Sequence, residues 1–220
     1  MNRPIVCYVT DRGALDAADS VECVLERVRT AVAAGVDWVQ IREKDLSGRE
    51  LLGLARNSVD ATNKPGRAGQ ARVVINDRLD VALASRAAGV HLGGGSVPAT
   101  EVVRWCRSGN APPEFLVGVS CHSIAEAREA ESAGASYVFF GPIFDTPSKR
   151  WFGPAQGTAR LAEVCQALRI PVMAIGGINE ENGADCIRAR AAGIAAVRFF
   201  QEPRGAHTLN DAVAGLHHLG

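Results

Sequence analysis

AAGVDWVQ (residues 33–40) is the first of four stretches in which an Ala-Gly step runs directly into β-branched, aromatic and other apolar residues. The other three are AAGVHLG (87–93), SAGASYVFFG (132–141) and AAGIAAVRFF (191–200). A helix often ends through a residue in the left-handed conformation, which glycine adopts without steric strain. We therefore expect one glycine of each stretch to end a helix just before a strand: Gly35, Gly89, Gly134 and Gly193.

Short β-branched runs alternate along the whole chain with longer segments in which apolar residues recur every three or four positions. The first pattern indicates buried strands and the second indicates helices with one apolar face. The expected strands span residues 5–10, 38–41, 73–75, 89–92, 116–120, 137–140, 172–174 and 195–199. The expected helices include residues 21–34, 49–63, 124–132, 180–190 and 207–219.

Eight strand–helix units, with Ala-Gly before every second strand, predict an α/β protein that is a single (β/α)8 barrel. A TIM barrel of this kind fits the chain length, and we expect residues 1–220 to form one domain. An open, doubly wound sheet remains the alternative, because the alternation of elements does not prove that the sheet closes.

The composition limits the classes of function. Lys plus Arg and Asp plus Glu number 24 each, so the basic excess typical of nucleic-acid-binding proteins is missing. No apolar run approaches the ~20 residues that span a bilayer, and no signal peptide is evident, so we expect a cytoplasmic protein. The six cysteines include no C-x-x-C pair, and we expect reduced thiols that serve as small buried residues.

Polar residues gather where the expected strands end. The loops at the C-terminal ends of barrel strands carry the chemistry in this architecture. Cations, hydroxyls, amides and one carboxylate suit a phosphorylated substrate, because Arg grips phosphate oxygens in a fork and Lys acts as a point charge. These candidates are Gln40, Arg42, Lys44, Asn76, Asp77, Ser120, His122, Thr146, Ser148, Lys149, Gly176 and Gly177.

Seven motifs, in order along nearly the whole chain, carry a resemblance to a known family. They are YVTDR (8–12), VQIREKDLSGREL (39–51), INDRLDVAL (75–83), GVHLG (89–93), GVSCHS (118–123), GPIFDTPSK (141–149) and AIGGI (174–178). In this order and spacing they resemble the thiamine phosphate synthases and their close relatives, the thiazole tautomerases.

The resemblance implies a transferase of thiamine biosynthesis. Such an enzyme joins 4-amino-2-methyl-5-hydroxymethylpyrimidine diphosphate to a thiazole phosphate and releases pyrophosphate. It also implies roles for the candidates: Gln40, Arg42 and Lys44 with Asn76 as the diphosphate clamp, Asp77 as a Mg²⁺ ligand, Ser120 and Lys149 at the diphosphate, Thr146 and Ser148 at the thiazole, and backbone N–H groups of Gly176 and Gly177 at the thiazole phosphate.

Several candidates have a plainer explanation. Arg42 and Lys44 can be solvated charges at a strand end, and Asp77 can cap a helix that begins near Arg78. The pair Gly176-Gly177 can be a tight turn, and His122 can be structural. His91, next to Leu and Val, is expected to be a core residue or to support a site residue.

Two stretches depart from the synthase pattern. Gly94-Gly95-Ser96 stands where that pattern has an Asp as second Mg²⁺ ligand, and Phe199-Phe200-Gln201 stands where a Ser-Ala pair is usual. We interpret the first as a lost acid that weakens or abolishes Mg²⁺ binding, with a phosphate-binding nest as the alternative. Both departures favour a thiazole tautomerase, an isomerase with His122 as acid and base. The retained Lys44, Lys149 and Asp77 favour the synthase, and a silent ligand-binding member is the third possibility.

Residues 145–156 form a long loop after the sixth strand, which makes it a candidate lid. The oligomeric state does not follow from the sequence. The expected partners are small phosphorylated molecules, with no nucleic acid and no membrane.

Overall fold

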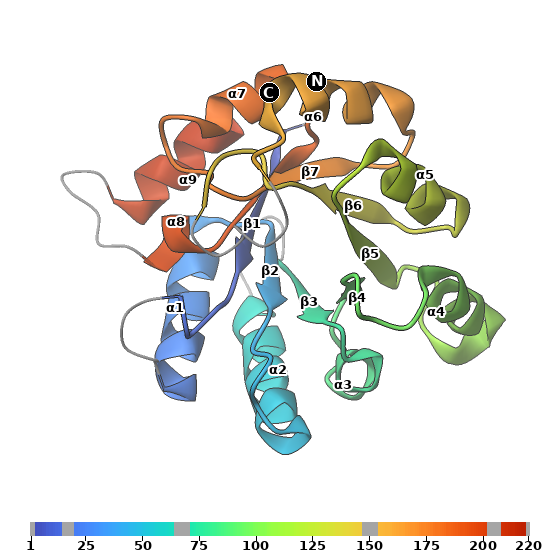
Figure 1. The fold of residues 1–220 in the computed structure, drawn as a ribbon. Helices are drawn as coiled ribbons and strands as arrows, with labels where there is room; N and C mark the ends of the chain where they lie inside the picture. Colours follow the sequence, from blue (N-terminus) through green and yellow to red (C-terminus); the bar gives the residue numbers. More distant parts are fainter. Residues whose placement is uncertain (1–2, 15–19, 64–70, 147–153, 202–207, 219–220) are drawn as a thin grey trace.

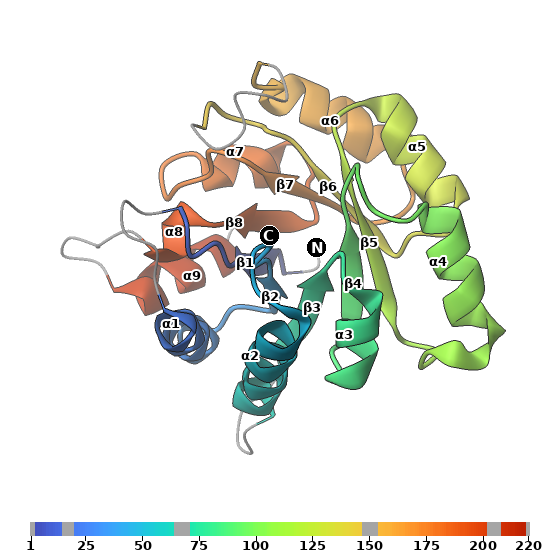
Figure 2. The same cartoon turned by 60° about the horizontal axis from the view of Figure 1, so that its bottom comes forward.

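The computed structural model describes residues 3–14, 20–63, 71–146, 154–201 and 208–218. Eight parallel strands close into a barrel in chain order, and β1 pairs with both β2 and β8. The helices surround this barrel (Figures 1 and 2). The predicted (β/α)8 barrel is therefore confirmed, and the alternative of an open sheet is wrong.

The strands are short and the helices of very different lengths. The strands are β1 (Ile5–Val9), β2 (Trp38–Ile41), β3 (Arg72–Asn76), β4 (Gly89–Leu92), β5 (Leu116–Cys121), β6 (Tyr137–Phe140), β7 (Val172–Ile175) and β8 (Gly193–Ala196). The helices are α1 (Val21–Ala34), α2 (Gly48–Thr62), α3 (Leu79–Ala84), α4 (Ala99–Trp105), the π-helical turn η1 (Cys106–Asn110), α5 (Ile124–Ser132), α6 (Gly157–Ala167), α7 (Gly183–Arg188), α8 (Arg198–Gln201) and α9 (Leu209–His217).

Four equivalent positions, each three residues before a strand, have the left-handed backbone that the repeat predicts. Before β2 and β6 the residue is glycine, with φ of 101° at Gly35 and 88° at Gly134. Before β4 and β8 the same conformation falls on Arg86, with φ of 58°, and on Arg190, with φ of 69°. The conformation is thus repeated four times, although glycine supplies it only twice.

Gly89 and Gly193 have a different task, and the expectation that they end helices is wrong. Each is the first residue of its strand, where the backbone of the next strand approaches closely. A Cβ atom on Gly89 would lie 2.3 Å from the carbonyl oxygen of Leu116, and one on Gly193 would lie 2.1 Å from that of Ile5. Glycine is required there by space and not by the sign of φ.

The predicted last strand is also misplaced, because β8 begins two residues earlier than expected and ends at Ala196. After Val197 the chain turns into the one-turn helix α8. The phenyl rings of Phe199 and Phe200 are buried there, and the ring of Phe200 lies 4.9 Å from that of Tyr8. Aromatic burial in a short helix therefore replaces the expected strand extension.

Apolar side chains form two layers. The larger layer fills the space between strands and helices, as with Val28, Leu54 and Leu161. The smaller one fills the inside of the barrel, where the rings of Trp38 and Tyr137 meet edge to face at 4.7 Å. The barrel is therefore a packed core and not a pore, so a ligand site must lie at one of its ends.

All six cysteines are free. Four are buried as expected, but Cys23 is exposed and Cys165 is half-buried, so the prediction of six buried thiols is wrong for these two. Among the described residues, no helix is both long enough and apolar enough to cross a bilayer.

Candidate active site

The site begins where β2 and β3 end side by side. Gln40 is buried, and its side-chain Nε2 donates a hydrogen bond to Oδ1 of Asn76 at 3.1 Å. Parallel pairing of the two strands brings these amides to the same end of the barrel. The family resemblance implies that both residues belong to one clamp, and in the structure their side chains are in contact.

Arg42 follows the last residue of β2, and residues at the end of β1 hold it. Its backbone N–H donates to Oγ1 of Thr10 at 2.9 Å, and its Nη1 donates to Oδ2 of Asp11 at 2.8 Å. The guanidinium is half-buried. A fork with one nitrogen held by Asp11 keeps its remaining N–H groups available for another anion.

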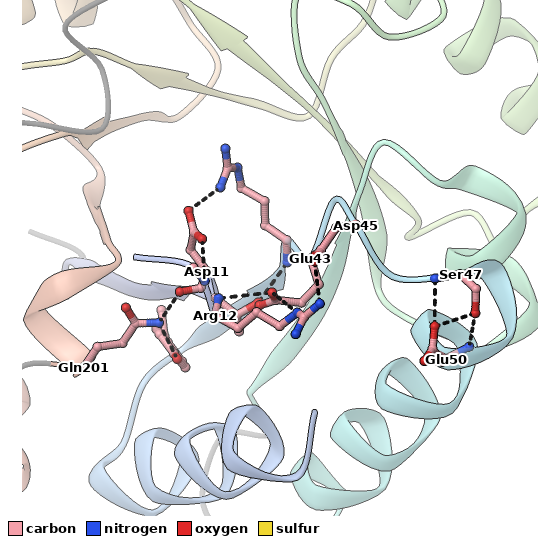
Figure 3. A network of polar contacts seen from close by, with 11 residues as sticks. Asp11, Arg12, Glu43, Asp45, Ser47, Glu50 and Gln201 are labelled. Atoms are coloured by element: carbon pink, nitrogen blue, oxygen red, sulfur yellow. Dashed lines mark hydrogen bonds and ion pairs between the residues drawn. The ribbon is translucent and has the colours of Figure 1, made fainter. Parts of the chain in front are cut away.

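A polar network lies directly beyond this pair (Figure 3). Glu43 is buried, and its Oε2 accepts from the backbone N–H of Arg12 at 3.1 Å. The guanidinium of Arg12 forms an ion pair with Asp45 and lies 3.9 Å from the carboxylate of Glu43. Burial raises the pKa of Glu43 above its ordinary value. Lys44 is exposed in the turn beyond the strand, so it does not share the buried position of Gln40.

Asp77 lies one residue past β3 in a left-handed conformation, with φ of 64°. Its backbone N–H donates to the carbonyl of His91 at 2.8 Å, which joins the ends of β3 and β4. Its side chain is exposed. The alternative role as a helix cap is not seen, because Arg78 occupies the N-cap position of α3, and that cap has no side-chain hydrogen bond within the described residues.

The Gly-rich stretch after β4 forms a local turn. Oγ of Ser96 accepts from the backbone N–H of Gly93 at 2.8 Å. None of the three glycines has a positive φ, so a nest built on a left-handed residue does not form here. Among the described residues, a Cβ atom on Gly94 or Gly95 would meet nothing within 4 Å.

Two side chains at this end of the barrel, Asp77 and Ser96, are possible Mg²⁺ ligands. Asp77 provides one exposed carboxylate, while Ser96 provides a hydroxyl that is already hydrogen-bonded. Within the described residues, no group of three or more His, Cys, Asp and Glu side chains could hold a metal. Mg²⁺ is commonly bound through one or two carboxylates together with substrate phosphates and water. Asp77 fits an ion that arrives with a diphosphate, and does not form a metal site by itself.

Ser120 is the next-to-last residue of β5, and its hydroxyl oxygen lies 2.8 Å from Nε2 of His91. The other ring nitrogen of His91, Nδ1, lies 3.1 Å from the hydroxyl of Tyr137. His91 and Tyr137 are both about 1% exposed. His91 is therefore a core residue, one of the two roles expected of it, and its ring contacts Ser120.

His122 directly follows β5 and is half-buried. Its Nδ1 lies 2.5 Å from the carbonyl oxygen of Gly141, and its backbone N–H donates to Oε2 of Glu126 at 2.7 Å. The side-chain amide of Gln156 donates to the carbonyl of His122 at 2.8 Å. Because a carbonyl only accepts, Nδ1 carries the proton, and Nε2 is the nitrogen that can act as a base when the ring is neutral.

The glycine pair after β7 is explained by close packing. Both residues have positive φ, 100° at Gly176 and 67° at Gly177. A Cβ atom on Gly177 would lie 2.6 Å from the carbonyl oxygen of Asp145. The tight-turn explanation therefore suffices for the glycines themselves, and their contact with a phosphate stays a prediction. Thr146, in the loop after β6, is half-buried.

Some predicted features lie outside the described residues. These are Ser148, Lys149 and most of the candidate lid at 145–156. The structure also adds residues that no motif singled out, above all Asp11, Glu43 and Tyr137, and it gives a contact to Gln201 of the second departing stretch. Gln201 is buried at the end of α8, and its Nε2 donates to the backbone carbonyl of Asp11 at 3.0 Å.

Known proteins resemble this chain over almost its full length. A family model described as thiamine monophosphate synthase matches residues 6–200. The thiamine-phosphate synthase of Methanoculleus marisnigri is 44% identical over 169 residues, which cover 77% of this chain and 76% of the relative. That of Chlorobium phaeobacteroides is 35% identical over 207 residues and 93% of each chain. A solved structure, thiamine phosphate pyrophosphorylase from Pyrococcus furiosus, superposes with a TM-score of 0.79 at 29% identity and covers 99% of this chain and 96% of that one.

The family model spans all eight strands, from β1 to α8, and therefore includes every strand end that contributes to the site. The likeness thus extends to the fold, the order of the motifs and the polar strand ends together. The chain belongs to the thiamine monophosphate synthase family.

Proposed function

We propose that this chain is a thiamine-phosphate synthase, a transferase that joins the pyrimidine diphosphate to the thiazole phosphate and releases pyrophosphate. Family membership supports a transferase acting on small phosphorylated substrates. The observation that carries the finer assignment is the arrangement at the ends of β2 and β3. There the guanidinium of Arg42 is held by Asp11 at 2.8 Å, and the amides of Gln40, two residues earlier in the chain, and Asn76 bond each other.

The reaction breaks the bond between the pyrimidine methylene carbon and a diphosphate oxygen. The diphosphate leaves with the electron pair, and the thiazole nitrogen then donates its pair to the pyrimidine cation. Charge develops on the leaving oxygens, so fixed donors aimed at them lower the barrier. Arg42 provides charged N–H groups, and Gln40 and Asn76 orient one another so that their remaining N–H groups are positioned in advance.

Mg²⁺, when bound with the diphosphate, would neutralise part of its charge. We assign its protein ligand to Asp77, which is exposed at the end of β3. Lys44, Ser148 and Lys149 remain proposed phosphate or substrate contacts, as do Thr146 and the N–H groups of Gly176 and Gly177. Six free cysteines agree with a reducing compartment such as the cytoplasm.

A coupled assay tests the proposal. Purified protein, both substrates and Mg²⁺ should yield thiamine phosphate. Arg42→Gln should lower kcat/KM for the pyrimidine diphosphate about 100-fold, as expected for a lost charge-assisted contact to phosphate. Arg160→Gln is the matched control, because Arg160 pairs only with Glu163 on the outer helix α6 among the contacts described, and its activity should stay within about twofold.

Other outcomes identify the alternatives. No product with any divalent metal, together with rapid isomerisation of the exocyclic thiazole tautomer, would make the chain a tautomerase. The geometry that favours this alternative is the fixed ring of His122, whose Nδ1 is bonded to Gly141. Neither reaction, with a ligand-dependent rise in Tm, would indicate a silent binder. Ser96→Asp should strengthen the response to Mg²⁺, and an unchanged response contradicts the lost-acid interpretation.

A further inference from the structure

A line of three polar side chains runs from the inside of the barrel to its C-terminal end. It begins at the hydroxyl of Tyr137, passes through the two ring nitrogens of His91, and ends at the hydroxyl of Ser120. The separations are 3.1 Å and 2.8 Å. Tyr137 and His91 are buried, whereas Ser120 is half-buried at the end of β5. The line therefore connects the core with the position proposed to meet the substrate.

The barrel makes specific room for this line. The interior of such barrels is normally filled by bulky branched apolar side chains. Here β5 carries Gly118, and a Cβ atom on it would lie 2.1 Å from Cζ of Tyr137. The ring of Phe139 lies 4.3 Å from the ring of His91 and contacts it from within the same layer. Packing thus fixes where both rings lie.

The need of each buried donor for an acceptor indicates which nitrogen of His91 carries the proton. If Nδ1 carried it, Nδ1 would donate to Tyr137, and the phenolic O–H would need another acceptor inside an apolar core. A buried donor without a partner costs about 1–3 kcal/mol. If Nε2 carries it, the phenol donates to Nδ1, and Nε2–H donates to the oxygen of Ser120. Burial raises the pKa of Tyr137 well above its ordinary value, so the phenol keeps its proton for this purpose.

The second arrangement determines what Ser120 does. A hydroxyl whose oxygen already accepts from Nε2–H turns its own O–H proton elsewhere, and the direction left is the end of the barrel. The atoms of a diphosphate that face outward are oxygens that only accept. A hydroxyl presented as a donor is therefore matched to this leaving group, and one presented as an acceptor would repel it.

We propose that His91 is a positioning residue, which binds the oxygen of Ser120 and so presents the Ser120 hydroxyl as a hydrogen-bond donor to the diphosphate. Tyr137 fixes the tautomer of His91 that makes this possible. The choice of diphosphate as ligand rests on the proposed function, whereas the tautomer and the direction of the Ser120 hydroxyl do not.

A double-mutant cycle tests whether His91 acts through Ser120. Ser120→Ala should lower kcat/KM for the pyrimidine diphosphate about 10- to 100-fold, the range for a lost hydrogen bond to a charged group. His91→Leu should cost about 10-fold in the native background and less than threefold in the Ser120→Ala background. His91→Gln, whose side-chain amide can still donate to Ser120, should recover most of the loss. KM for the thiazole phosphate should stay within about twofold.

Losses that multiply in the double variant, or a failure of Gln to recover activity in a protein with native Tm, would overturn the proposal. The cycle can be repeated with inorganic pyrophosphate and calorimetry, which needs no turnover. Unchanged pyrophosphate affinity in both single variants contradicts the positioning role, whatever reaction the protein performs. If the unaltered protein forms no thiamine phosphate but the pyrophosphate affinities of the variants follow the expected cycle, only the proposed function is contradicted.

The tautomer is open to direct measurement in the unaltered protein. Imidazole ¹⁵N NMR on histidine-labelled protein at pH 7 distinguishes the two neutral forms, and the signals missing in His91→Gln assign the residue. We expect Nε2 to carry the proton and Nδ1 to accept. Protonation at Nδ1 would refute the arrangement even if His91→Leu failed to fold.

Discussion

Gly118 lies so close to the ring of Tyr137 that no side chain larger than hydrogen fits between them. The neighbouring strand leaves no room for more, since a Cβ atom would lie 2.1 Å from Cζ of that ring. The situation at Gly94 is the opposite, because an added Cβ atom meets nothing within 4 Å among the described residues and φ is not positive. Space therefore requires glycine at position 118, whereas neither space nor backbone conformation requires it at position 94.

We predict that Gly118→Ala lowers the free energy of unfolding by about 1–3 kcal/mol, the usual cost of overpacking a core. Gly94→Ala should leave the free energy of unfolding unchanged or raise it by up to about 1 kcal/mol, because alanine restricts the unfolded chain. Urea unfolding of both variants makes the comparison. Equal effects at the two positions would mean that the barrel interior adapts to the added methyl group.

We expect the cysteines to differ in reactivity because they differ in burial. Thiolates react and thiols do not. Burial raises the pKa of Cys121 and of Cys186 to about 12 and that of Cys165 to about 11. Cys23 is exposed at the start of α1.

We therefore predict that a thiol reagent at pH 8 labels Cys23 quickly in the native protein and the buried cysteines only after unfolding. The rapid phase should disappear in Cys23→Ser. Mass spectrometry of the labelled peptides provides the check. Rapid labelling of Cys121 would show that β5 opens far more readily than its burial indicates.

Two glutamates close in sequence have opposite electrostatics: Glu43 lies between β2 and α2, and Glu50 lies in the first turn of α2 (Figure 3). Glu43 is buried, and burial raises its pKa. Glu50 is exposed and closes a capping box with Ser47, and hydrogen bonds from Ser47 lower the pKa of Glu50. A raised carboxyl pKa in the folded state means that stability falls as pH rises through it. A lowered one means that stability is lost as pH falls through it.

We predict that Glu43→Gln becomes more stable relative to the native protein as pH rises from 4 to 7, because the amide avoids a buried charge. Glu50→Gln should become relatively less stable over the same range, since the charge-assisted cap is lost only where the carboxylate is ionised. Urea unfolding at both pH values measures the two trends. The same sign for both variants would contradict the assignment of burial and capping as the dominant causes.

Some elements can be predicted from the sequence more accurately than others. The bounds of α1 and α5 are predicted to the residue, because in both an apolar or alanine repeat begins directly after a serine cap. Periodicity misplaces the end of β8, because a run such as AAVRFF is apolar both as a strand and as a buried helical turn. It also misassigns Gly89, because a close approach between strands leaves the same letter as a left-handed turn.

Within the site, the strand ends follow from the sequence, but the contacts between them do not. The pattern of strands predicts that Gln40 and Asn76 lie at the same end of the barrel, and the family resemblance implies that they act together. The contact of Arg42 with Asp11 joins residues 31 positions apart, and that of His91 with Tyr137 joins residues 46 apart. Such pairs depend on the register of the closed barrel, which no local pattern of side chains encodes.

Closure of the barrel is supported at its N-terminal end by one carboxylate. Asp37, just before β2, accepts from the backbone N–H of Val6 in β1 at 2.8 Å. It also pairs with Arg3 and lies 2.9 Å from Nε2 of His217 in the last helix, α9. One side chain therefore ties the first strand to the end of the chain.

We predict that Asp37→Ala lowers the free energy of unfolding by about 1–3 kcal/mol, because the backbone N–H of Val6 loses its partner in a part-buried setting. Activity per folded molecule should not change, since Asp37 lies at the opposite end of the barrel from the proposed site. Urea unfolding and the coupled assay on one preparation test both statements. A fall in kcat without a fall in stability would contradict them.

Gly89 and Gly193 occupy equivalent places in the two halves of the barrel. Each opens the fourth strand of its set, β4 or β8, and each yields space to the strand that begins the other set, β5 or β1. The residue with positive φ before β2, β4, β6 and β8 likewise alternates between glycine and arginine. The barrel is thus organised as two four-stranded halves that meet at two matching joints. Cutting the chain between η1 and β5 and producing the halves together should restore the closed ring, and two pieces that never associate would show that the symmetry is one of form alone.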